Sequence, residues 1–227
     1  MDIKHNFESV RQRITEAALR AGRDPRDIKL LAVSKYQPLE VIAAAYQAGQ
    51  TLFAESRVQE WQEKARQLPS ACAWHFVGRL QTNKVKYLDD RMSVLHSLDR
   101  FELLPELEKH GQRLGHIWTA LLQVNIAEDP AKAGLPVADV QDFLAVLPDY
   151  PHVRVRGLMT IGRLGATPLE TRGFFRALHQ RRAIWQSQAP PGMDLSELSM
   201  GMSDDFEIAV EEGATIVRIG RRVFAEL

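Results

Sequence analysis

Residues 30–38 read Leu-Leu-Ala-Val-Ser-Lys-Tyr-Gln-Pro, an apolar β-type segment that runs into a lysine and then a proline. The strand must stop before Pro38, because proline has no N–H for further strand pairing. Lys35 is therefore expected at the carboxyl end of a buried strand, where desolvation can lower the pKa of an amine and prepare it to react with a carbonyl. A solvated strand-end lysine is the ordinary alternative for this segment taken alone.

Similar short apolar segments recur along the 227 residues and alternate with longer amphipathic ones, a pattern typical of βα units around a parallel sheet. Eight strands are predicted, at residues 30–34, 51–55, 74–78, 94–98, 121–125, 153–160, 195–200 and 216–220. Eight strands in βα order predict an α/β fold in which residues 1–227 form a single domain, a (β/α)8 TIM barrel.

An additional helix is predicted over residues 1–22, because apolar side chains recur at spacings of three and four from Phe7 to Ala21. Asn6 is its expected N-cap and Gly22 its expected end. This helix is expected to close the lower end of the barrel. After the fourth strand, Pro105 is expected to interrupt or kink a helix.

The composition argues against several classes of partner. Lys plus Arg and Asp plus Glu both total 29, so no net field attracts nucleic acid or an anionic membrane. No window approaches the roughly 18 uninterrupted apolar residues of a membrane span. The single Cys72 cannot form an internal disulfide, the N-terminus is charged rather than signal-like, and no metal-ligand spacing occurs. A soluble, cytoplasmic protein is predicted.

Closure of the barrel predicts which distant residues meet. Strand eight lies beside strand one, so Lys35 should be a neighbour of residues 218–220, at the end of the barrel where active sites gather. On strand eight, Ile216, Arg218 and Gly220 share one face. Residues 198–205 leave strand seven, turn at glycine and enter a helix, and such free N–H groups suit a phosphate dianion. These features together predict a site for a phosphorylated aldehyde.

Each of these features also has an ordinary structural interpretation. A buried Arg218 requires an acceptor, and an ion pair with Glu55 or Asp99 is an equal alternative to a functional role. The turn at residues 199–205, with Ser203 or Asp204 before the helix, is also consistent with helix capping alone. His75 lies in an apolar strand and is predicted to be a core histidine with satisfied hydrogen bonds.

The chain resembles the pyridoxal phosphate homeostasis protein family through motifs that occur in the family's order from residue 30 to residue 220. They are LLAVSKYQP, FAESRVQE, WHFVGRLQTNK, HSLDR, LLQVNIAEDPAKAGL, VRGLMTIG and LSMGMSDDFEIAVEEGATIVRIG. The resemblance implies a barrel similar to the N-terminal domain of bacterial alanine racemase. It also implies that pyridoxal 5′-phosphate (PLP) is bound to the lysine after the first strand.

The resemblance assigns a role to each matching residue. Lys35 matches the Schiff-base lysine, and Arg218 matches the arginine that faces the pyridine nitrogen. Positions that hold the phosphate are matched by Ser199, Met200, Gly220 and, through its main-chain N–H, Arg221. Residues expected by analogy to line the top of the barrel are Asn125, Met159 and Thr160.

Two positions depart from the family pattern, and one loop lysine matches it. Where the family has Phe-Gly-Glu-Asn, residues 53–56 read Phe-Ala-Glu-Ser. Ala54 and Ser56 thus replace glycine and asparagine, and Ser56 is expected to reach the cofactor through water. Lys132 matches a lysine that offers PLP a second, transient attachment.

The residues expected around PLP predict little catalysis. PLP is a strong electron sink when a carboxylate keeps its ring nitrogen protonated, whereas an arginine can only donate a hydrogen bond. Alanine racemase also uses a tyrosine from its partner's C-terminal domain, and the chain is expected to lack such a domain. We therefore expect a monomeric PLP carrier of vitamin B6 homeostasis that buffers PLP or delivers it to PLP-dependent apoenzymes. The alternatives are a low-activity racemase, with Lys35 and either Tyr36 or His75 as bases, and a phosphate-binding barrel enzyme without PLP.

Overall fold

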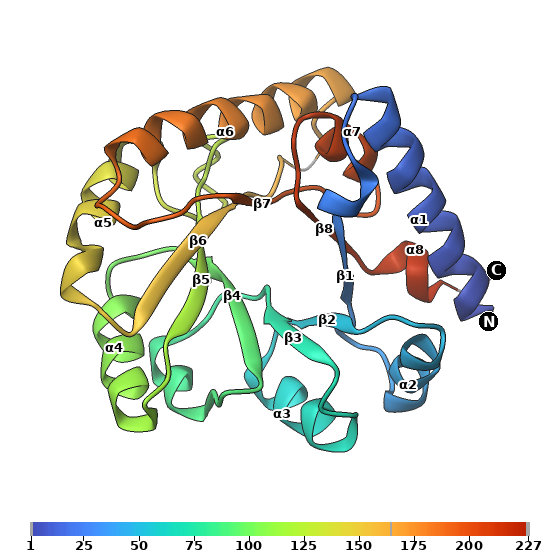
Figure 1. Cartoon of the computed structure of the whole chain (residues 1–227), viewed down its shortest axis with the longest axis horizontal. Helices are drawn as coiled ribbons and strands as arrows, with labels where there is room; N and C mark the ends of the chain where they lie inside the picture. Colours follow the sequence, from blue (N-terminus) through green and yellow to red (C-terminus); the bar gives the residue numbers. More distant parts are fainter. Residues whose placement is uncertain (1, 164, 226–227) are drawn as a thin grey trace.

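The computed structural model describes residues 2–163 and 165–225, in which eight parallel strands form one closed barrel in sequence order (Figure 1). The strands are β1 (Lys29–Val33), β2 (Leu52–Glu55), β3 (Ala73–Phe76), β4 (Met92–Leu98), β5 (Trp118–Gln123), β6 (Val153–Met159), β7 (Glu197–Ser199) and β8 (Ile216–Ile219). Each overlaps a predicted strand, so the predicted α/β barrel is confirmed.

Helices surround the barrel as an outer ring (Figure 1). The α-helices are α1 (Ile3–Arg20), α2 (Leu39–Gln47), α3 (Val58–Gln67), α4 (Leu103–Leu114), α5 (Val140–Val146), α6 (Pro168–Gln188), α7 (Phe206–Glu211) and α8 (Arg221–Phe224). The 3-10 helices are η1 (Pro25–Asp27), η2 (Thr82–Tyr87), η3 (Val137–Asp139) and η4 (Leu147–Asp149). Among the described residues, no helix is both long enough and apolar enough to cross a membrane.

Side-chain alternation along the strands separates two apolar layers. The larger layer lies between strands and helices and includes Val217 and Ile219 of β8. A smaller cluster inside the barrel includes Leu31, Met159 and Ile216. Ile216 and Val217 thus point to opposite sides of β8, as the period of two requires. The small interior cluster leaves room for polar side chains inside the barrel.

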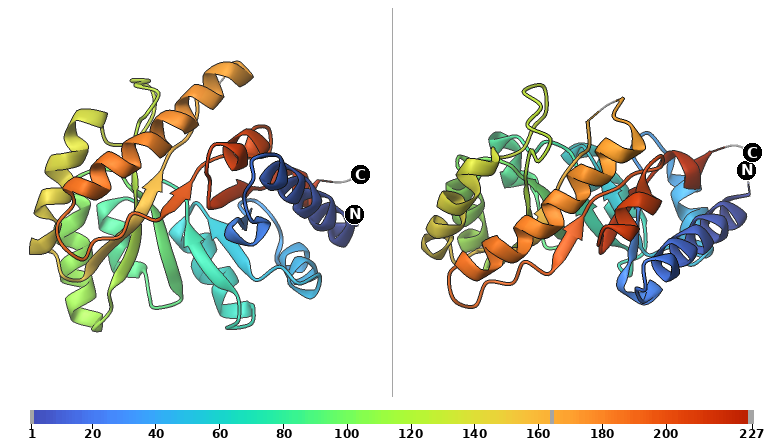
Figure 2. Two further views of the ribbon diagram at one scale, coloured as in Figure 1. Left: turned by 45° about the horizontal axis from the view of Figure 1, so that its top comes forward. Right: turned by 90° about the horizontal axis from the view of Figure 1, so that it is seen from above.

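The N-terminal helix is present, but its predicted position is wrong. Helix α1 does not close the lower end of the barrel; it lies in the outer ring beside α7 and α8 (Figure 2). Its Phe7 ring packs edge-on against Phe224 of α8, with ring centroids 5.9 Å apart. Because α7 and α8 are short, α1 supplies apolar cover for the barrel that a longer eighth helix would otherwise give.

Two details of the predicted helices are also corrected. The α1 N-cap is Asp2, whose carboxylate accepts from the first turn, while Asn6 is buried inside the helix and donates to the main-chain oxygen of Ala225 at 3.0 Å. Gly22, with φ +67°, follows the end of α1 as predicted. Pro105 neither interrupts nor kinks the chain into two helices. It lies in the first turn of α4, where a missing N–H breaks no helical hydrogen bond.

Candidate functional site

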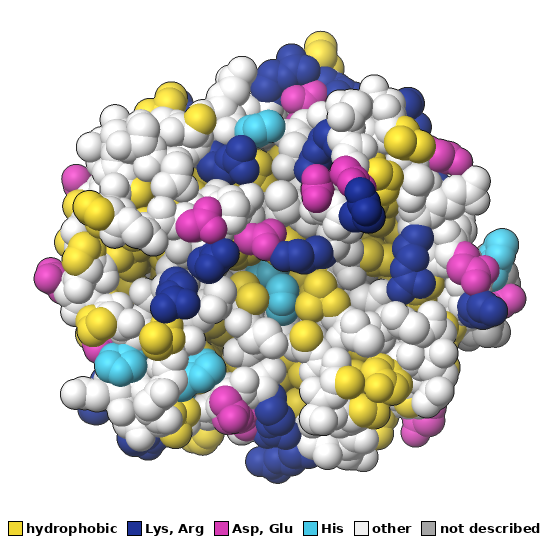
Figure 3. All heavy atoms as spheres, in the orientation of Figure 1, with side chains coloured by type: hydrophobic (Ala, Val, Ile, Leu, Met, Phe, Trp, Pro, Cys, Tyr) yellow, Lys and Arg dark blue, Asp and Glu magenta, His cyan; other side chains and the backbone are white. Residues whose placement is uncertain are grey.

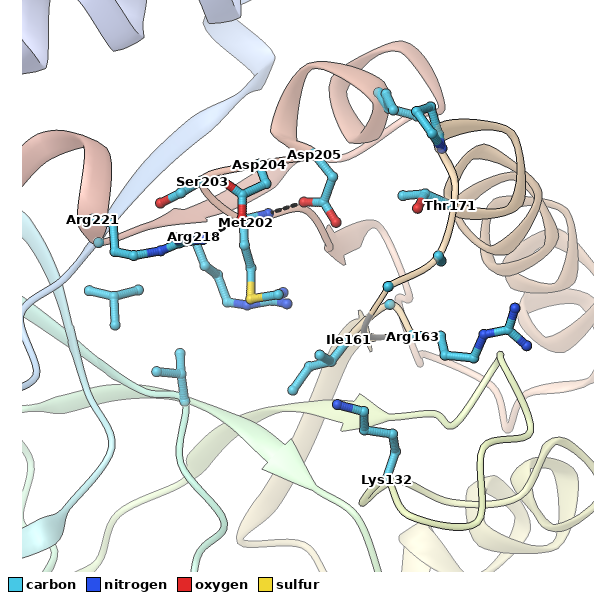
Figure 4. A pocket seen from close by; sticks show the side chains of 18 of the residues that line it. Lys132, Ile161, Arg163, Thr171, Met202, Ser203, Asp204, Asp205, Arg218 and Arg221 are labelled. Atoms are coloured by element: carbon cyan, nitrogen blue, oxygen red, sulfur yellow. Dashed lines mark hydrogen bonds and ion pairs between the residues drawn. The ribbon is translucent and has the colours of Figure 1, made fainter.

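A cavity of about 540 Å³ opens among the loops that follow the carboxyl ends of the strands (Figure 4). Its volume lies within the range of roughly 300–1,000 Å³ that is usual for small-ligand sites. Six residues singled out from the sequence line it: Lys35, Ser56, Lys132, Arg218, Gly220 and Arg221. Arg218 and Lys132 point into it from opposite sides (Figure 4). The prediction that active residues gather at this end of the barrel is consistent with this arrangement.

The pairing of β1 with β8 brings Lys35 to this cavity. Leu31 is paired with Arg218. Val33, which ends β1, and Lys35, two residues further on, both line the cavity. The Lys35 side chain is solvent-exposed, and its Nζ lies 5.9 Å from the centroid of the Tyr36 ring. Tyr36 has φ +65°, which turns the chain sharply directly after the lysine. The amine therefore lies at the mouth of the cavity.

A buried ion pair fixes the residue that precedes Lys35. The Glu55 carboxylate, which has no solvent exposure, accepts from Lys64 Nζ at 2.5 Å and from Ser34 Oγ at 3.0 Å. Lys64 also donates to the main-chain oxygen of Ser34 at 2.9 Å. Lys64 was not identified from the sequence. The one available signal is its spacing from Trp61, which places it on the buried face of α3.

The ion pairs suggested for Arg218 do not occur. Glu55 is paired with Lys64, and Asp99 is paired with Arg100 and, at 3.6 Å, with Arg79. Both carboxylates therefore neutralise other cations. The alternative interpretation of Arg218 as a member of a structural ion pair with either residue is wrong.

Arg218 is held by neutral acceptors. Its side chain is 5% exposed, and it donates from Nη1 to Ser199 Oγ at 2.7 Å and from Nη2 to the main-chain oxygen of Thr160 at 2.8 Å. Burial lowers the pKa of Arg218 to about 10, and the charge of Asp205 opposes that shift. The guanidinium remains charged at neutral pH, fixed in orientation and able only to donate.

Five residues expected at the ligand lie outside the cavity wall, among them Thr160, which is fully buried and whose hydroxyl donates to the Val124 oxygen. Ser199 and Met200 are fully buried below it, and Met159 belongs to the apolar cluster inside the barrel. Asn125 instead holds its own loop, since its side chain donates to the main-chain oxygen of Asp129 at 2.8 Å and accepts from the Asp129 N–H. Of these residues, Ser199 accepts from Arg218 and Asn125 fixes the loop that carries Asp129.

The second half of the turn after β7 lines the cavity in their place. Met202, Ser203 and Asp205 form this wall, and the Met202 N–H donates to Asp205 Oδ1 at 2.6 Å (Figure 4). Gly201 makes the turn possible: it has φ +87°, and a Cβ there would lie 2.4 Å from Ala209 Cβ. Burial raises the pKa of the Asp205 carboxyl. The sequence identified this turn, and the part of it that lines the cavity begins at Met202, three residues after Ser199.

Two residues that line the cavity, one after β7 and one after β8, have main-chain N–H groups without an acceptor among the described residues. Within the described residues, no acceptor receives the main-chain N–H of Ser203 or that of Arg221. Gly220 lines the same cavity and is packed closely against β1, where a Cβ would approach the Val33 oxygen at 3.1 Å. Both residues line the cavity, and unbonded main-chain N–H groups together with the Ser203 hydroxyl are donors of the kind that suits a phosphate group.

These groups fit PLP chemically. An amine suits its aldehyde, a fixed guanidinium suits a ring nitrogen that accepts a hydrogen bond, and the free N–H groups suit its phosphate. A lysine after β1, with unbonded N–H groups after β7 and β8, is the arrangement expected of a barrel that binds a phosphorylated aldehyde. The family model described as "Alanine racemase, N-terminal domain" matches residues 2–226.

Comparison with proteins of similar sequence identifies the family within this class of barrel. The pyridoxal phosphate homeostasis protein of Aquifex aeolicus is 40% identical over 227 residues, covering 100% of this chain and 99% of the relative. Its counterpart from Escherichia coli K12 is 36% identical over 229 residues, covering 98% and 96%. The chain belongs to the pyridoxal phosphate homeostasis protein family.

Solved structures agree with this assignment. PipY of Synechococcus elongatus PCC7942 with PLP bound is 37% identical, with a TM-score of 0.86 over 99% of this chain and 100% of PipY. Alanine racemase of Corynebacterium glutamicum has a TM-score of 0.74 at 16% identity, over 99% of this chain and 61% of the racemase. The racemase comparison shows a shared barrel fold only.

Proposed function

We propose that this protein binds PLP as a Schiff base on Lys35 and serves vitamin B6 homeostasis by buffering PLP or delivering it to apoenzymes, with little or no catalytic turnover. The observation that carries the proposal is that Lys35 and the buried Arg218 line one cavity. The names of the relatives and the PLP bound to PipY support the same ligand.

Each residue of the cavity wall has a proposed task. The Lys35 amine adds to the aldehyde carbon and releases water, and Arg218 donates to the ring nitrogen. The N–H groups of Ser203 and Arg221, beside Gly220, hold the phosphate. Ser199 acts on Arg218 rather than on the ligand. Positions proposed to support the cavity from below or from its rim are Met200, Met159, Asn125, Ser56 and Lys132.

The residues around this cavity also argue for low catalytic turnover. Bound PLP supplies an electron-withdrawing ring, and that withdrawal is strongest when a carboxylate protonates the ring nitrogen. Arg218 has no removable proton at neutral pH, since its pKa is about 10. His75, one of the two candidate second bases, is buried inside the barrel and does not line the cavity. Burial lowers its pKa to about 3, which makes it a weak base for a racemase.

Spectra of the protein mixed with PLP test the attachment. The wild type should develop the absorbance of a protonated imine and retain PLP covalently after borohydride reduction. Lys35→Ala should do neither, whereas Lys132→Ala, which removes another lysine from the same wall, should do both. An imine of unchanged intensity in Lys35→Ala would overturn the proposed attachment.

Activity, oligomeric state and location have separate tests. Amino-acid enantiomers incubated at high protein concentration should show no interconversion, and Lys35-dependent rates of roughly 1 per second or more would overturn the low-turnover proposal. We also propose a cytoplasmic monomer. Light scattering after size exclusion should give the mass of one 25.7 kDa chain, and cell fractionation should recover the protein with cytoplasmic markers.

A further inference from the structure

A second cavity, of about 350 Å³, opens at the opposite end of the barrel, where the strands begin. Figure 3 shows this face, with a histidine and hydrophobic side chains at its centre and charged side chains around them. The cavity is lined by Lys29, Leu52, His75, Val94, Thr119, Leu121, Arg154, Arg156, Glu197 and Ile216. Helix α1 lies in the outer ring and leaves this mouth open.

A hydrogen-bonded chain inside the barrel connects the two cavities. Arg218 Nη1 lies 2.7 Å from Ser199 Oγ, Ser199 Oγ lies 2.9 Å from His96 Nδ1, and His96 Nε2 lies 2.8 Å from His75 Nδ1. Arg218 lines the upper cavity and Ser199 is buried below it, whereas His75 lines the lower cavity. The three contacts involve residues from β3, β4, β7 and β8.

Arg218 sets the direction of every proton in this chain. A guanidinium can only donate, so the Ser199 oxygen accepts from Arg218. The Ser199 hydroxyl has no acceptor other than His96 Nδ1 among the described residues, so its proton is placed toward that nitrogen. His96 then carries its proton on Nε2 and donates to His75 Nδ1. The remaining proton of neutral His75 is therefore on Nε2.

Within the described residues, the Nε2–H of His75 is a donor without a partner. Among residues 2–163 and 165–225, no acceptor bonds to this nitrogen, although the side chain is only 6% exposed and forms part of the cavity wall. Burial lowers the pKa of His75 to about 3 and that of His96 well below 6.5, so both rings are neutral and keep these tautomers.

The charges around this donor favour an anion. Lys29, Arg154 and Arg156 line the cavity with one carboxylate, Glu197. Lys29 is paired with Glu197, and Arg156 is paired with Asp194 at 3.1 Å. Arg154 has no hydrogen bond or ion pair within the described part of the chain, so its charge is available.

We propose that this lower cavity binds a small organic carboxylate with a short apolar tail. The carboxylate accepts from His75 Nε2–H and is paired with Arg154, and the tail lies against Leu52, Leu121 and Ile216. The apolar wall distinguishes such a ligand from inorganic phosphate. The site is separate from the proposed PLP site and stands or falls independently of it.

Titration of the full-length protein with butanoate, followed by NMR of ¹⁵N-labelled histidine, tests the site. Saturable binding is expected, with a dissociation constant on the order of 1–10 mM, as suits a ligand of six heavy atoms. The largest shift should fall on His75 Nε2, with its proton on that nitrogen before and after binding. Butanamide, the neutral isostere, should not bind.

Two arginine variants distinguish the effect of a positive charge in this cavity from the effect of the protein's overall charge. Arg154→Gln should weaken butanoate binding about fivefold, the upper range for an exposed ion pair. Arg66→Gln removes an exposed arginine outside the cavity and should leave binding unchanged. Absence of saturation by 100 mM butanoate, equal binding of butanamide, or equal binding by Arg154→Gln would each overturn the proposal. A His75 proton on Nδ1 would also overturn it.

Discussion

Replacement of Lys64 by methionine should destabilise the barrel and loosen the segment that carries Lys35. Lys64 Nζ lies 2.5 Å from Glu55 Oε1 and donates to the Ser34 oxygen, inside a region where Glu55 has no solvent exposure. Methionine keeps most of the length and apolar contacts of lysine but removes its charge. The variant therefore leaves Glu55 as a buried carboxylate without its cation.

The hydrogen bonds that Glu55 keeps in Lys64→Met determine how much unfolding free energy is lost. Loss of one partner from a buried ion pair costs about 3–5 kcal/mol of unfolding free energy. Glu55 would still accept from Ser34 Oγ at 3.0 Å and from the Ser56 N–H at 3.1 Å, so the lower end of that range, about 3 kcal/mol, is expected. Lys64→Met combined with Glu55→Gln buries no charge and should lie within about 1–2 kcal/mol of the wild type.

Urea unfolding followed by tryptophan fluorescence measures these differences, provided that the slope with denaturant is the same for all variants. Lys109→Met is the matched control, because Lys109 is exposed on α4, and its stability should equal that of the wild type. The affinity for PLP should also fall in Lys64→Met, although Lys64 does not line the cavity. A loss below about 1 kcal/mol, or a double variant as unstable as the single one, would refute the reasoning.

Two further predictions concern Arg218 and His75, the two ends of the hydrogen-bonded chain inside the barrel. Arg218→Glu should allow protonation of the ring nitrogen of bound PLP and shift the imine absorbance, and an unchanged spectrum with PLP still bound would remove Arg218 from the ring. The pKa of His75 falls from 6.5 to about 3 on folding, so the unfolded chain binds more protons between these values and stability is lost as pH falls through that window. Unfolding free energy should drop by about 2 kcal/mol between pH 8 and pH 5 from His75 alone, and an equal drop in His75→Asn would contradict this.

The sequence was sufficient for features that depend on local patterns. Short apolar segments that alternate with amphipathic ones located all eight strands, and barrel closure then predicted that Lys35 and Arg218 meet. Features that depend on depth inside the barrel were missed. Ser199 belongs to the predicted turn, but whether it faces the ligand or Arg218 depends on how far β7 extends along the barrel. Lys64 resembles a surface lysine until the buried Glu55 is located beside it.

The hydrogen-bonded chain inside the barrel explains why Arg218 suits the proposed PLP site of a carrier protein. The Arg218 guanidinium donates to Ser199 Oγ and to the Thr160 main-chain oxygen, and two neutral histidines, His96 and His75, follow Ser199 in the hydrogen-bonded chain. These acceptors fix the guanidinium without neutralising it, because none of them carries a negative charge. A carboxylate in direct contact would satisfy the arginine equally well, but it would also lessen the positive charge that opposes protonation of the ring nitrogen. In the proposed site, neutral acceptors thus preserve the condition under which PLP is held by Lys35 and its electron-withdrawing power stays weak.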